Sequence, residues 1–130
     1  MATGIFNHMA HESNKKLIGS SAGLCAQGGP ASSNAVAVMD EIGIDIRSHT
    51  SRQLSESILE TADLVLTMSE SHKQAICQIF PEYDSKIHTL GEFVGANESV
   101  ADPYGGNMDA YRRCRDQIHQ LMGKVIKKLI

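Results

Sequence analysis

One short segment, residues 63–68, limits the folds that this chain can adopt. It reads Asp-Leu-Val-Leu-Thr-Met, a nearly continuous apolar run that is bounded by polar residues. Such a run is typical of a strand that is buried on both faces of a parallel sheet. A parallel sheet is therefore the first feature that we expect in the fold.

Helical and strand patterns alternate along the rest of the chain. Apolar residues at helical spacing, capping residues and stop signals predict helices at residues 3–13, 31–42, 55–62, 69–80 and 107–130. Two further short apolar segments predict strands at residues 17–22 and 86–90. This alternation predicts an α/β protein with a parallel sheet.

Length, charge and cysteine usage narrow the class of protein. A chain of 130 residues is long enough for one domain with a single core. The net charge of -3 argues against a surface for nucleic acid or anionic lipid. No apolar run reaches the roughly 18 residues of a membrane span, and no secretion leader is recognisable. Cys25, Cys77 and Cys114 are odd in number and far apart, which favours reduced thiols in a cytoplasm.

One histidine pair could suggest a metal site. His8 and His11 lie one helical turn apart. No third or fourth ligand accompanies them at a sensible spacing, so a solvated helix face is the favoured interpretation. We expect neither a metal nor another cofactor.

Several short segments form a pattern that runs from one end of the chain to the other. They are residues 1–6, 21–23, 44–45, 48–54, 62–68, 71–73 and 101–106. The most specific is Asp-Pro-Tyr at residues 102–104, placed before a long C-terminal helix. Together they resemble the low-molecular-weight protein-tyrosine phosphatase family, in the bacterial type that includes protein-arginine phosphatases.

The resemblance implies a three-layer α/β/α sandwich with the flavodoxin-like topology of phosphotyrosine phosphatase I. The family opens with an inner strand and a phosphate loop of the pattern Cys-x5-Arg, and Met1-Ala2 resembles the residues just past that loop. We therefore expect residues 1–130 to form one phosphatase-like domain, N-terminally truncated, that keeps three of the family's four parallel strands. The loss of an inner strand would expose sheet edges, so we expect either that residues 17–22 move over to pair with residues 64–68 or that two chains associate as a homodimer.

The family's nucleophile is the cysteine of that loop, and the loop arginine and backbone amides hold the phosphate. The residues six positions after Cys25, Cys77 and Cys114 are alanine, tyrosine and glutamine, so none of them gives Cys-x5-Arg. We therefore expect residues 1–130 to be inactive by themselves.

The resemblance assigns four other site residues. Asp102 would be the general acid, although Asp-Pro before Tyr-Gly-Gly is also good turn chemistry. Tyr104 would flank the substrate side chain. Ser21 and His49 would brace the phosphate loop by hydrogen bonds, or they are polar residues at a cap and a strand end.

Three functions remain open from the sequence. The family hydrolyses phosphotyrosine or phosphoarginine on proteins through a phospho-cysteine, which makes a phosphorylated protein the expected partner. A non-catalytic pseudophosphatase that acts as a binding module is the alternative. A thiol-coupled arsenate reductase is less favoured, because Cys77 stands alone where that enzyme needs several close cysteines.

Overall fold

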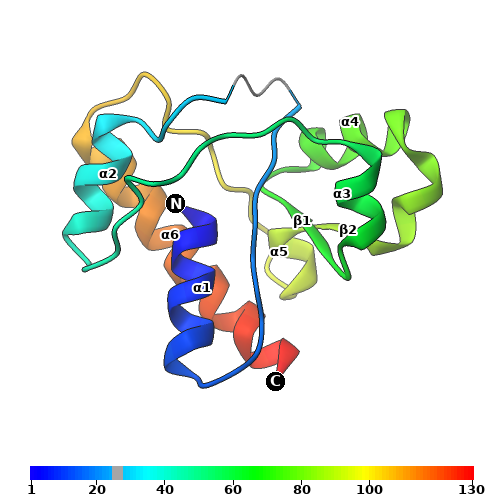
Figure 1. The fold of residues 1–130 in the computed structure, drawn as a ribbon, viewed down its shortest axis with the longest axis horizontal. Coiled ribbons are helices and arrows are strands. Elements are labelled where there is room, and N and C mark those ends of the chain that lie inside the picture. The colour runs from blue at the N-terminus through cyan, green and yellow to red at the C-terminus, as the bar shows by residue number, and fades with distance from the viewer. Residues whose placement is uncertain (25–27) are drawn as a thin grey trace.

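The computed structural model describes residues 1–24 and 28–130, so Cys25 lies outside the described residues. The elements in chain order are α1 (Ala2–Glu12), α2 (Ser33–Asp40), α3 (Glu56–Thr61), β1 (Val65–Thr67), α4 (Glu70–Ile79), the 3₁₀ helix η1 (Pro81–Lys86), β2 (Ile87–Thr89), α5 (Leu90–Phe93) and α6 (Met108–Leu129). Figure 1 shows their arrangement. The five predicted helices and the predicted strands at residues 63–68 and 86–90 are confirmed.

The predicted parallel sheet is present. Strands β1 and β2 run parallel, with Val65 opposite Ile87 and Thr67 opposite Thr89. The crossover between them carries α4 and η1, as a parallel connection requires. The fold is therefore α/β with a parallel sheet, as the sequence predicted.

The strand predicted at residues 17–22 is wrong, and the described sheet has two strands instead of three. The segment is drawn as an extended trace without an arrow (Figure 1). Among the described residues, side chains and not a neighbouring strand bond its backbone: Asn7 pairs with Gly19, and Arg52 Nε donates to the Ser21 carbonyl at 3.0 Å. Ile18 is 94% exposed. A short apolar run becomes a strand only where a backbone edge lies beside it.

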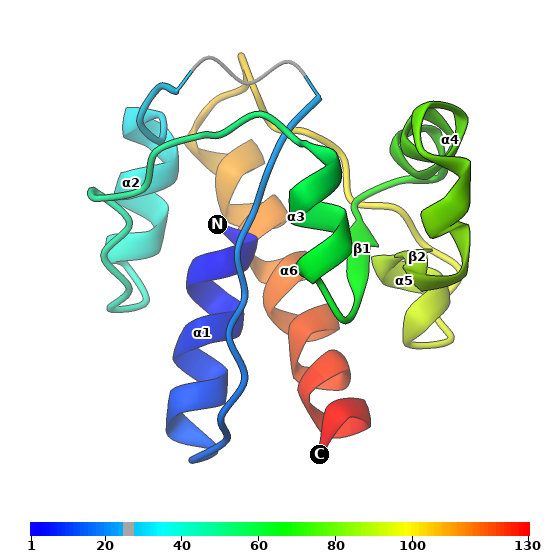
Figure 2. The same cartoon turned by 45° about the vertical axis from the view of Figure 1, so that its right-hand side comes forward.

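Two hydrophobic clusters form the core of the described part of the chain. The larger one joins α1, α2 and α6 through fully buried side chains, among them Ile5, Val38, Met39, Leu121 and Val125. Each such side chain stabilises the fold by about 1.5–3 kcal/mol through its burial. Helices α1 and α6 lie side by side in both views (Figure 1 and Figure 2). Helices α1 and α2 therefore both pack against α6.

The smaller cluster lies between α3, α4 and the sheet. Its buried members are Leu59, Ile76 and Ile87. In the described part of the chain, no helix combines the length and the apolar character that a membrane span requires.

A short helix, α5, was not predicted. The Thr89 hydroxyl accepts from Glu92 N–H at 3.0 Å, and Glu92 Oε1 accepts from Thr89 N–H at 2.8 Å, which is a capping box. Residues 96–98 pack directly on this helix, because a Cβ at Gly91 would lie 2.2 Å from the Glu98 carbonyl oxygen. Helix α5 thereby fixes the path of the chain that leads toward Asp102.

Candidate functional site

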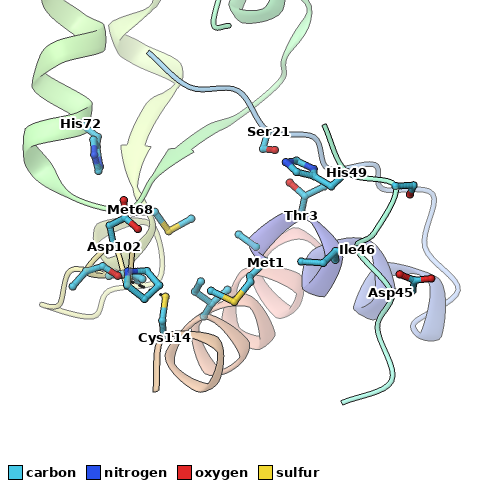
Figure 3. A pocket seen from close by; sticks show the side chains of 17 residues that line it. Met1, Thr3, Ser21, Asp45, Ile46, His49, Met68, His72, Asp102 and Cys114 are labelled. Atoms are coloured by element: carbon cyan, nitrogen blue, oxygen red, sulfur yellow. Dashed lines mark hydrogen bonds between the residues drawn. The ribbon is translucent and has the colours of Figure 1, made fainter. Parts of the chain in front are cut away.

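A cavity of about 450 Å³ opens between the end of β1, the start of α1 and the two loops at residues 45–49 and 100–103. Its lining residues come from six separate segments of the chain. Figure 3 shows how their side chains surround the cavity. They are Met1, Ala2, Thr3, Gly4, Ser21, Asp45, Ile46, Ser48, His49, Met68, His72, Val100, Ala101, Asp102, Pro103, Cys114 and Ile118. The cavity therefore gathers residues from most of the length of the chain.

Asp102 lines this cavity in an exposed loop. Its Oδ1 accepts a hydrogen bond from Tyr104 N–H at 3.0 Å, and Gly106 N–H donates to the Pro103 carbonyl at 2.8 Å. Gly105 has a φ of 80°, a conformation that residues with a side chain rarely adopt. The Asp-Pro-Tyr-Gly-Gly sequence thus forms a turn, and the turn presents the carboxyl at the cavity.

Ser21 and His49 line the cavity across from Asp102, with His72 and Met68 on the side of Asp102 (Figure 3). His49 is half-buried and Ser21 is exposed. Tyr104 is 84% exposed and, within residues 1–24 and 28–130, is not part of the lining. Three of the four predicted site residues therefore meet at one cavity, and the fourth lies beyond it.

Cys114 lies at the base of the cavity, below Asp102 (Figure 3). Its Sγ donates to the Ala101 carbonyl oxygen at 3.6 Å. Burial raises the pKa of the Cys114 thiol, the Met1 ammonium partly offsets that change, and the Asp102 carboxylate raises the pKa further. Cys114 is therefore held as a neutral thiol.

Residues 1–130 match the sequence model of the family described as low molecular weight phosphotyrosine protein phosphatase. This chain belongs to that family. The protein-arginine-phosphatase of Bacillus subtilis (strain 168) is 37% identical over 131 residues, which cover 99% of this chain and 87% of that protein.

Solved structures of the phosphatase family have the same fold. The low-molecular-weight protein tyrosine phosphatase from T. tengcongensis superposes with a TM-score of 0.94 at 43% identity, covering 98% of this chain and 88% of that one. A cysteine-to-serine variant of the YwlE arginine phosphatase, with a phosphorylated active-site serine, has a TM-score of 0.95 at 37% identity, covering 98% of this chain and 85% of that one.

Sequence reasoning assigned no role to His72 or Cys114 in this phosphatase-family site. Both line the cavity, and His72 Nδ1 lies 2.9 Å from Ser69 Oγ at the start of α4. Neither residue carries a local signal, because Met68, His72 and Cys114 meet through the fold and not through their spacing. Cys114 belongs to the apolar stripe of α6, so the sequence pattern does not distinguish it from the core residues of that helix.

No group of three or more histidine, cysteine, aspartate or glutamate side chains that could hold a metal ion occurs in the described residues. His8 lies on the exposed face of α1 and pairs with Glu12 at 3.0 Å.

Proposed function

We propose that this chain supplies the general acid, Asp102, of a phosphatase site. That site acts on phosphorylated proteins through a phospho-cysteine. The observation that carries the proposal is the position of Asp102 at a cavity that Ser21 and His49 line from the other side. We also propose that residues 1–130 do not turn over substrate by themselves, because they contain no Cys-x5-Arg.

In this mechanism Asp102 acts twice. As a carboxylic acid it protonates the leaving group while a thiolate takes the phosphoryl group, and as a carboxylate it then activates the water that releases phosphate. The Tyr104 amide engages Oδ1, which leaves Oδ2 as the atom that carries the transferred proton. A positioned acid contributes about 10²- to 10⁴-fold in rate, which cannot replace covalent catalysis and an anion cradle.

The two described thiols do not suit the role of the nucleophile. Partial burial, followed by the hydrogen bond from Cys77 Sγ to Asp84 at 3.3 Å, raises the pKa of Cys77. Burial likewise raises the pKa of Cys114. Reactive cysteines have lowered pKa values, so neither of these two thiols has the environment of a reactive cysteine.

Of the two substrates of the family, we propose phosphoarginine. A single aromatic residue, Tyr104, is followed by Gly105, so a second aromatic wall against a phenyl ring is missing at this position. A flat, charged guanidinium group needs no such wall. The 37% identity to a protein named as an arginine phosphatase supports the same choice.

The test compares residues 1–130 with the same chain extended at its N-terminus by an opening strand and a Cys-x5-Arg loop of the kind that the family resemblance implies. We expect hydrolysis of p-nitrophenyl phosphate and of phosphoarginine peptides by the extended protein, and none above buffer by the original chain. In the extended protein, Asp102→Asn should lower kcat by about 10²-fold or more. A folded extended protein with no turnover, or with turnover that ignores Asp102→Asn, would contradict the proposal.

We further propose a homodimer in a reducing cytoplasm. Among the described residues β1 pairs with β2 alone, and an open edge of a parallel sheet invites another strand. Light scattering at micromolar concentration should give the mass of two chains, whereas the extended protein should be a monomer. A monodisperse monomer of the original chain, with slow amide exchange at residues 65–67, would exclude this assembly.

A further inference from the structure

The segment that leads to Asp102 is held on one side by the sheet. Val100 N–H donates to the Met68 carbonyl oxygen at 2.9 Å, just after the end of β1. The Val100 side chain is 4% exposed and belongs to the larger core cluster. These contacts anchor the residue two positions before Asp102.

The same segment is held from the other side by α6. Gln117 Nε2 donates to the Ser99 carbonyl oxygen at 2.9 Å, and Cys114 Sγ donates to the Ala101 carbonyl oxygen at 3.6 Å. Residues 114 and 117 lie one turn apart on the same face of the helix. Two donors from one helix face therefore bind the carbonyl groups on either side of Val100.

We propose that Gln117 and Cys114 are positioning residues that hold the Asp102 carboxyl at the cavity. The inference rests on the proposed role of Asp102 and adds the two side chains that set its place. Neither residue touches substrate in this proposal, and both act through the backbone of residues 99–101.

The physical reason is the contrast between an exposed loop and a helix that is anchored in the core. Asp102 is exposed and is held locally by one turn, whereas Leu121 and Ile118 of α6 are buried in the core. A misplacement of about 1 Å at a reacting group can cost about 10²-fold in rate. Because residues 99–101 are bonded to α6, the backbone that leads to Asp102 is fixed relative to the core, and the position of the carboxyl is fixed with it.

Tyr104 provides a reporter that needs no catalysis. Its amide N–H donates to Asp102 Oδ1, so its proton chemical shift changes when the carboxyl moves or gains a proton. The amide order parameters of residues 101–104 report how firmly the loop is held. Both can be measured by NMR on the chain as it exists.

The experiment compares Gln117→Ala and Gln117→Glu with Gln120→Ala, which changes an exposed glutamine of the same helix. Gln117→Glu keeps the side-chain length, but its carboxylate cannot donate and lies near Glu98, whose Oε2 is 3.4 Å from Gln117 Nε2. Both Gln117 variants should shift the proton resonance of the Tyr104 amide toward the position that it has when the Asp102 carboxyl is protonated. They should also lower the amide order parameters of residues 101–104 from about 0.85 to below about 0.6. Gln120→Ala should leave both unchanged.

A second pair tests the thiol. Cys114→Ala should loosen residues 101–104 in the same way, and Cys114→Ser, which keeps a donor, should restore a large part of the order. An unchanged Tyr104 amide in both Gln117 variants, or equal loss in Cys114→Ala and Cys114→Ser, would overturn the positioning role.

The two proposals fail separately. If the extended protein described above is folded but inactive, the proposed role of Asp102 as the general acid is excluded. The NMR result still decides whether α6 holds the loop. If the extended protein is active, Gln117→Ala in it should lower kcat by about tenfold or more with little change in KM. An equal kcat in that variant would remove the positioning role and leave the acid role standing.

Discussion

The side chain of Asn7 forms two hydrogen bonds with the backbone of Gly19. Gly19 N–H donates to Asn7 Oδ1 at 2.7 Å, and Asn7 Nδ2 donates to the Gly19 carbonyl at 3.0 Å. A paired strand would give a residue these same two bonds. One amide on α1 thus takes the place of a neighbouring strand for the extended segment at residues 17–22.

Replacing Asn7 should release this segment. Asn7→Asp keeps an acceptor and loses the donor, and its second oxygen would face the Gly19 carbonyl; Asn7→Ala loses both bonds. We expect faster amide exchange at Gly19 in both variants and a loss of about 0.5–1.5 kcal/mol in unfolding free energy per bond. His11→Ala, on the exposed face of the same helix, is the control. Unchanged exchange at Gly19 would show that other contacts hold the segment.

Gly19→Ala should also destabilise the segment, for a steric reason. A Cβ at this position would lie 2.7 Å from Phe6 Cδ1, so the aromatic ring has to move. Overpacking of this kind typically costs about 1–3 kcal/mol, which urea denaturation can measure. Gly29→Ala, where a Cβ meets nothing within 4 Å, should stay close to the parent protein. A similar midpoint for both variants would mean that the Phe6 ring yields freely.

Gly91→Ala should have a large effect through the chain that leads to Asp102. The new Cβ would lie 2.2 Å from the Glu98 carbonyl oxygen and 2.9 Å from that of Ala96, both backbone atoms that cannot rotate away. We expect a loss of several kcal/mol in stability, on the order of the most severe core substitutions. Gly123→Ala in α6 is the matched control, and it should change the stability in the opposite direction. Its Cβ meets nothing within 4 Å, and helix propensity predicts a gain of about 0.5–1 kcal/mol.

Stability should fall in acid partly through Glu41. Hydrogen bonds from Arg112 and then Arg115 lower the pKa of Glu41 from 4.5 to about 2. Because the folded-state pKa is lowered, this contribution is fully present above pH 4.5 and is lost as the pH falls toward 2. The Tm difference between the parent protein and Glu41→Gln should therefore shrink across that range. Glu60→Gln is the control, and a Tm difference that does not depend on pH would contradict the assignment.

Local patterns in the sequence were enough to predict much of this molecule. The periodicity of α6, the apolar run of β1 and the stop at Pro81 depend on neighbouring residues, so the chain itself contains their signal. The turn at Asp102 is also local, because Asp, Pro and Gly set its backbone conformation. The same short-range motifs, in order, identified the phosphatase family.

Tertiary structure decided what the local patterns could not. Residues 17–22 have the composition of a strand, yet whether they pair depends on which backbone lies beside them, and Asn7 occupies that place for Gly19. The contacts from Gln117 and Cys114 to residues 99 and 101 likewise join segments whose relation no spacing reveals. Helix and turn formation are governed by neighbours in the chain, whereas strand pairing and the position of the carboxyl at the cavity are governed by neighbours in space.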